Sequence, residues 1–142
     1  MKRSIALRNY LLATGSLKAA LAGGELRIFG GTVPADANAA TTGATLLCTL
    51  LDAGSGINFD TAAAGGVLSK DPGETWTGIN AAGGVATFFR HVLSADANDA
   101  STTALRIQGT IATAGADMVL GNTTLISGAV QSMPNYSVAA PE

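Results

Sequence analysis

The 142-residue chain carries eight basic and ten acidic residues, and only 13% of its residues are charged. This length fits one domain with a core of its own, whereas the charged fraction is about half that of ordinary globular domains. A single cysteine excludes an intrachain disulfide, and no apolar run of about 18 residues predicts a transmembrane helix. A surface so poor in charge favours a subunit covered by neighbouring proteins over a freely dispersed monomer.

Residues 1–24 differ from the rest of the chain. They include four basic residues and no acidic one, and Gly23-Gly24 marks the end of the segment. Six residues recur at helical spacing and form one stripe: Leu7, Tyr10, Leu11, Thr14, Leu17 and Leu21. The segment is therefore predicted to be a helical arm.

The ends and sides of this arm can also be predicted. Ser4 and Ser16 are plausible N-caps, and the sequence around Gly15 predicts a break into two short helices. Ile5 and Leu12 lie off the stripe, which predicts that the arm touches two surfaces, its own body and a neighbour. An ordinary N-terminal helix packed on its own sheet carries equal weight. A secretory signal is not expected, because charged and small residues interrupt the apolar stretch.

After residue 24 the apolar period changes to two, which indicates β-strands. Strands are predicted at 25–29, 45–51, 57–59, 66–69, 75–79, 85–93, 105–112, 118–120 and 129–139. The strand at 45–51 is apolar on both faces and is expected to be central, whereas Pro134 marks 129–139 as an edge. Seven to nine short strands with turns every 8–12 residues or roughly so predict a mainly β fold, an antiparallel β-sandwich of jelly-roll or Ig-like type. The domain organisation is an arm, 1–24, and a β body, 25–142.

Two short sequences occur twice. Ala-Asp-Ala-Asn stands at 35–38 and 95–98, and Leu-Arg-Ile stands at 26–28 and 105–107. Because the two spacings differ, these echoes do not form a tandem repeat. They are interpreted as independent turn chemistry, in which Asp and Asn side chains bond to the backbone of their own turn.

No group of residues predicts catalysis, a metal site or a cofactor. Cys48 lies in an apolar strand and is expected to be buried, while His91, the only histidine, is expected on a sheet surface or in an interface. Asp96, Asn98 and Asp99 lack the spacing of a calcium loop. Asp71 and Glu74 flank a Pro-Gly turn and are expected to be solvated.

The charge asymmetry suggests what the arm binds. The body holds four basic and all ten acidic residues, so its net charge is −6 and it would repel phosphate. Neither nucleic acid nor a membrane is expected as a partner, and an acidic protein surface is favoured. The candidate partner-binding residues are Lys2, Arg3, Ile5, Arg8, Leu12 and Lys18.

Residues 24–39 read GELRIFGGTVPADANA, which resembles the "L-x-I-Y-S-G-x-x-P-A-x-A-x-A" opening of small structural proteins of tailed bacteriophages. Phe29 and Gly30 depart from its Tyr-Ser pair. GGVATFFR at 83–90 resembles the "G-x-A-T-x-F-R" strand of that group. RIQGT, GADMVL and TTLISGA, at 106–110, 115–120 and 123–129, resemble its closing section. The resemblance covers most of 24–138 and implies a virion component, assembled in the host cytoplasm.

Three functions follow as expectations. The first is a capsid decoration (cement) protein, present in many copies, that binds the major capsid protein and copies of itself. The second is a tail, neck or baseplate component of the same particle. The third is a receptor- or carbohydrate-binding module, with Trp76 as a sugar platform, although a lone tryptophan is more often part of a core or an interface. In the first case, deletion of residues 2–22 is expected to leave the β body folded while abolishing assembly.

Overall fold

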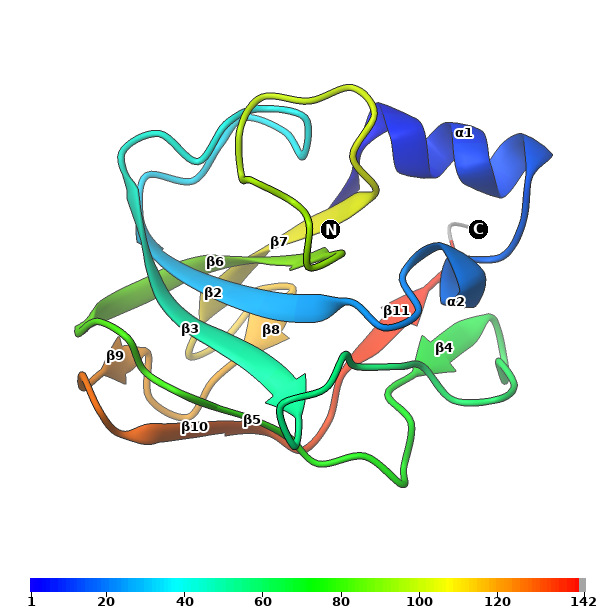
Figure 1. Ribbon diagram of the computed structural model, residues 1–142. Helices are drawn as coiled ribbons and strands as arrows, with labels where there is room; N and C mark the ends of the chain where they lie inside the picture. The colour runs from blue at the N-terminus through cyan, green and yellow to red at the C-terminus, as the bar shows by residue number, and fades with distance from the viewer. Residues whose placement is uncertain (141–142) are drawn as a thin grey trace.

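The chain folds mainly into antiparallel β-strands, with two short helices near its N-terminus (Figure 1). The computed structural model describes residues 1–140. The helices are α1 (Ile5–Ala13) and α2 (Leu17–Ala20). The strands are β1 (Lys2–Arg3), β2 (Glu25–Gly31), β3 (Ala44–Asp52), β4 (Val67–Ser69), β5 (Trp76–Ile79), β6 (Gly84–Val92), β7 (Arg106–Ala112), β8 (Met118–Val119), β9 (Thr124–Leu125), β10 (Val130–Met133) and β11 (Ser137–Ala139). The mainly β, antiparallel prediction is confirmed.

Both helices begin where the sequence predicts. The hydroxyl of Ser4 accepts a hydrogen bond from the Leu7 amide, and that of Ser16 accepts one from the Ala19 amide. These side chains satisfy amide groups that lack partners within the first helical turn. The chain leaves α1 at Thr14 and starts α2 after Ser16, so the predicted break is also confirmed.

One large sheet organises the body. Its strand order is β1-β7-β6-β2-β3-β5-β10, with β8 added beside β7 and β9 beside β6. The β7–β8 pair is parallel, and the other pairs are antiparallel. β3 lies between β2 and β5, as its two apolar faces predicted.

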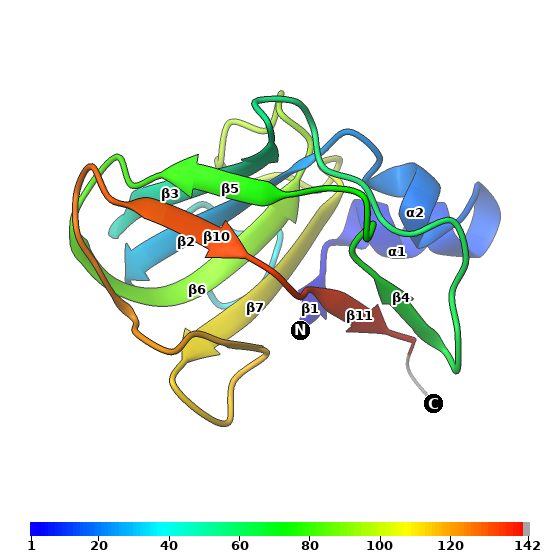
Figure 2. The same ribbon diagram turned by 90° about the horizontal axis from the view of Figure 1, so that it is seen from below.

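The sheet curls so that β5 and β10 cross over its inner face (Figure 2). β5 pairs with β3 only at Leu51 and Asp52, the last two residues of that strand. The β5–β10 pair therefore leaves the direction of the main sheet at the end of β3. The apolar side chains of both layers meet between them, where Trp76 from β5 and Phe89 from β6 are buried.

The prediction of one continuous edge strand at 129–139 is wrong. The structure divides it at Pro134 into β10, which pairs with β5, and β11, which pairs with β4 in a separate two-stranded sheet. Proline has no amide hydrogen for a strand ladder and fixes the backbone torsion φ. The break therefore allows one segment of chain to contribute to two sheets.

The arm is part of the body's core. β1 pairs with β7, and Leu7, Ala20 and Leu21 are at most 3% exposed within the main hydrophobic cluster. The Ser4 hydroxyl donates to the Ala104 carbonyl and accepts from the Arg106 amide. The helical stripe thus faces the chain's own sheet, as expected of an ordinary N-terminal helix packed on its own body.

Gly78 on β5 is expected to tolerate no side chain. A Cβ atom there would lie 2.1 Å from the Thr49 carbonyl oxygen and 3.0 Å from the sulfur of Cys48. We expect Gly78→Ala to lower the free energy of unfolding by about 1–3 kcal/mol, because backbone atoms must shift to relieve the overlap. Urea unfolding measures this change. Gly121→Ala is the matched control, since its Cβ would meet no atom within 4 Å; equal stability of the two variants would contradict the prediction.

Candidate functional site

The four basic residues of the arm, which the sequence suggested as partner-binding residues, differ in their exposure. Lys2 and Arg8 are exposed, whereas Arg3 and Lys18 are half-buried. The Lys2 ammonium donates to the Ala35 carbonyl at 2.6 Å, and the Arg3 guanidinium donates to a β11 carbonyl. The side chains of Lys2 and Arg3 therefore help to hold the arm to the body.

The outward side of α1 carries an apolar stripe with one cation, which we call the outer arm stripe: Ile5, Arg8 and Leu12. These positions follow the i, i+3, i+7 spacing of one helix face. Leu12 is 85% exposed and Ile5 is 37% exposed, while Leu7 on the opposite face is fully buried. The arm therefore has one apolar face in the core and a second facing outward.

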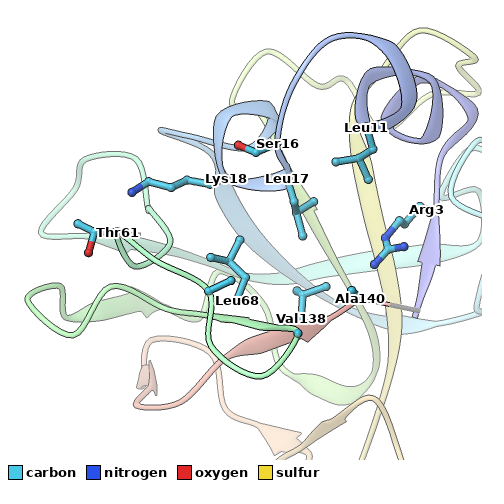
Figure 3. Close-up of a pocket in the computed structure, with 11 residues that line it drawn as sticks. Arg3, Leu11, Ser16, Leu17, Lys18, Thr61, Leu68, Val138 and Ala140 are labelled. Atoms are coloured by element: carbon cyan, nitrogen blue, oxygen red, sulfur yellow. The ribbon is translucent and has the colours of Figure 1, made fainter. Parts of the chain in front are cut away.

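A hollow of about 420 Å³ lies between the arm and the β4–β11 sheet; we call it the arm groove. Leu11 and Leu17 come from the arm side, and Leu68 and Val138 face them from β4 and β11 (Figure 3). Residues 61, 63, 66 and 140 complete the wall with small side chains, together with Ser16. The groove is thus mainly apolar.

Cations flank the arm groove. Figure 3 shows the Lys18 side chain on one side of the leucines and Arg3 on the other. Arg3 donates to the Ala139 carbonyl at 3.1 Å and also lines a second hollow of about 450 Å³. Beyond it, the terminal amine of Met1 pairs with Asp117 at 2.5 Å. The pKa of that carboxyl is lowered, since hydrogen bonds and the nearby amine outweigh its partial burial.

The opposite, outer face of the main sheet carries a buried polar network that the sequence did not predict. Arg27, Arg90 and Gln108 stand in register on β2, β6 and β7, and Arg106 lies two residues from Gln108. All four are at most 6% exposed. The loops at 32–43 and 93–105 cover them and lie side by side in Figure 1.

The arginines bind these loops. Arg106 forms an ion pair with the Asp96 carboxylate through two nitrogens, and Arg27 donates to the Asn98 side chain at 2.9 Å. Arg90 donates to the Ala39 carbonyl at 2.7 Å. Burial and the neighbouring Arg106 lower the pKa of Arg90 to about 10, so it stays charged at neutral pH. The network ties both loops to the sheet.

The two sequence echoes meet in this network. Asp36 and Asp96 each accept a hydrogen bond from the amide two residues later, so the predicted turn chemistry is confirmed. The turns are not independent, however, because the Thr41 amide donates to the Asn98 carbonyl and the Ser101 amide donates to the Asn38 carbonyl. Both arginines of the Leu-Arg-Ile echo also bind the second loop. The echoes were the only sequence signal for this network.

His91 was wrongly placed on the surface. It is fully buried, with aromatic neighbours Phe59, Trp76 and Tyr136 at ring-centroid distances of 5.2–6.2 Å. The reason is that β6 is covered on both faces, by the loops outside and by β5 and β10 inside. Cys48 is buried as predicted, and burial raises the pKa of its thiol to about 11. A buried neutral thiol is a poor nucleophile.

The expectation that Glu74 is solvated is wrong, and Trp76 lies in the core, which was the more common of the two positions considered for it. Trp76 is 1% exposed, and its indole nitrogen donates to the Glu74 carboxylate at 2.6 Å. The same carboxylate accepts bonds from the backbone and side-chain amides of Asn58. Glu74 therefore organises a turn instead of pointing into solvent, and Trp76 offers no sugar platform.

The buried His91 is expected to make stability depend on pH. Burial lowers the pKa of its imidazole from 6.5 to about 3, so below pH ~6.5 the unfolded chain binds a proton that the folded chain does not. The free energy of unfolding should fall by about 2–3 kcal/mol between pH ~7 and pH ~4.5. Urea unfolding at each pH measures this loss, and His91→Gln should flatten it. A wild-type stability that is constant across this range would refute the expectation.

Within residues 1–140, no cluster of three metal-ligating side chains occurs. Over the same residues, no helix has the length and apolar character needed to cross a membrane. Comparisons with protein-family models, curated proteins and solved structures gave no match for this chain.

Proposed function

We propose that this chain is a non-enzymatic structural protein of a tailed-phage particle, a decoration (cement) protein that binds the major capsid protein. The outer arm stripe is the observation that carries the proposal. Leu12, 85% exposed on a helix whose other face is in the core, is a typical contact residue for a neighbouring subunit. Many weak contacts of this kind add up when they are repeated over a shell.

A second apolar surface supports contacts with more than one neighbour. Ile79 and Val130 are cross-strand partners on β5 and β10, 68% and 70% exposed, and Ile126 is 69% exposed. The ends of β5 and β9 and the start of β10 lie at the far end of the molecule from α1 in both views (Figures 1 and 2). Copies of the same chain and the capsid protein are the proposed partners.

The finer fold class belongs to the same proposal. We assign the body to the antiparallel β-sandwiches, with β5–β10 as the second layer, and regard residues 1–24 as a helical arm fixed to it. The layer arrangement in Figure 2 supports this class.

The copy number in purified particles tests the role. Quantitative mass spectrometry should find this chain in numbers comparable to those of the major capsid protein. A few copies per particle would contradict decoration and favour the alternative, a tail, neck or baseplate component. The carbohydrate-binding alternative depended on an accessible Trp76. The burial of this side chain leaves that alternative without its sugar platform.

The stripe itself is tested by substitution. Leu12→Ser should reduce incorporation into particles at least about fivefold while leaving the melting temperature unchanged, because an exposed leucine contributes to contacts and little to folding. Ala13→Ser, at the next exposed position, is the matched control. Normal incorporation of the Leu12 variant would refute the role of the stripe.

A further inference from the structure

The arm groove has features that the outer arm stripe lacks. It is concave, and its volume of about 420 Å³ lies in the range of pockets that enclose a ligand group. Its facing walls are leucine and valine side chains, so an apolar group can be removed from water there (Figure 3). The groove therefore suits one apolar anchor instead of a flat contact.

The charges around the groove indicate that the bound partner is negatively charged. Its lining includes Arg3 and Lys18 and no acidic residue. The whole arm, residues 1–24, contains no acidic residue either. A ligand with carboxylates on both sides of an apolar group would meet Lys18 at one end of the groove and Arg3 at the other. The basic arm of a second copy would be repelled.

The strand β11 borders the arm groove with one face. The Tyr136 carbonyl accepts from the Lys70 amide, and the Ala140 amide donates to the Gly66 carbonyl, at the two ends of β4. Because backbone groups alternate along a strand, those of Ser137 and Ala139 point away from β4. The Ala139 carbonyl indeed receives the Arg3 guanidinium from that side. This edge carbonyl is thus already occupied, and Ala139 lines the second hollow, so β11 meets the arm groove with its face, through the Val138 side chain.

We propose that the arm groove binds an acidic segment of the neighbouring virion protein. One apolar side chain of the segment fills the hollow between Leu17 and Leu68, and flanking carboxylates pair with Lys18 and Arg3. The proposal rests on the proposed attachment function and adds to it the chemistry of the partner. It also assigns Arg3 and Lys18 a different role from Arg8 and Leu12, which face outward.

Methyl NMR of the full isotope-labelled chain tests this proposal without the particle. The probe is a blocked hexapeptide of alternating glutamate and leucine, and its lysine-leucine counterpart is the control peptide. The acidic peptide should shift the methyl signals of Leu11, Leu17, Leu68 and Val138, and the lysine peptide should bind at least about tenfold more weakly. The exposed Val130, far from the groove, reports non-specific apolar binding.

Two matched variants locate the peptide. Ala63 is exposed and lines the groove, whereas Ala62 is exposed and is not part of the lining. Ala63→Phe should weaken binding about tenfold by filling the hollow, and Ala62→Phe should leave it unchanged. Equal binding of both peptides, equal shifts at Val130, or absence of groove shifts at millimolar peptide would each overturn the proposal. Copy number in particles tests the attachment function separately, so the two failures are distinguishable.

Discussion

Deletion of residues 2–22 is expected to unfold the protein instead of releasing a folded β body. The deletion removes Leu7 and Leu21, both 0% exposed, from the main hydrophobic cluster. Each fully buried leucine contributes about 1.5–3 kcal/mol. The deletion also removes β1 from the edge of β7 and leaves the Arg106 amide without its Ser4 partner. The combined loss reaches the total stability of an ordinary domain, about 5–15 kcal/mol.

Circular dichroism and urea unfolding of the truncated chain test this expectation. Point variants separate the two faces of α1: Leu7→Ala should cost about 2–5 kcal/mol, and Leu12→Ala should stay within about 0.5 kcal/mol of the wild type. A truncated chain that unfolds cooperatively with an unchanged midpoint would show that the arm is dispensable for folding, as the sequence had suggested.

Replacement of Asp96 is expected to cost about 3–5 kcal/mol, the second large effect. Its carboxylate pairs with Arg106, whose side chain is 2% exposed, and lies 4.0 Å from Arg27. Asp96→Asn would leave the buried Arg106 guanidinium without its counter-charge, whereas Arg27 would keep its ion pair with Glu25. The same substitution weakens the turn at Asn98, whose amide donates to Asp96. The loops at 32–43 and 93–105 should then loosen together.

Asp99→Asn is the matched control, because Asp99 lies in the same loop, is exposed, and binds Arg106 only through its backbone carbonyl. Urea unfolding gives the two free energies, and hydrogen exchange at Thr41 and Ser101 reports the contact between the loops. If Asp96→Asn and Asp99→Asn were equally stable, the network would not hold the loops in place.

The arm shows how far local pattern carries a prediction. The helical stripe, both serine caps and the break near Gly15 depend on residues within a few positions of one another, and all are present in the structure. The same pattern left open what each face touches. A face of a helix is apolar for the same physical reason whether it packs on its own sheet or on another protein.

For the strands, too, local pattern predicted some features and left others open. The strong period-two segments correspond to β2, β3, β6 and β7, because alternation reflects the pleat of the strand itself. The two-residue strands β1 and β9 were missed, since so few residues carry no period. The single strand predicted at 129–139 became two because its halves find different partners.

The sequence by itself determined the two helices with their caps, the long strands β2, β3, β6 and β7, the turn chemistry of the two Asp-Asn loops and the contrast between a basic arm and an acidic body. Only the tertiary structure decided that both loops share one arginine network, that His91 and Trp76 are buried, and that Arg3 and Lys18 flank a groove. The physical reason is that periodicity and capping are local properties of the chain. Burial and ion pairing depend instead on which distant segment covers a residue, as Asp96 covers Arg106 and β5 covers His91.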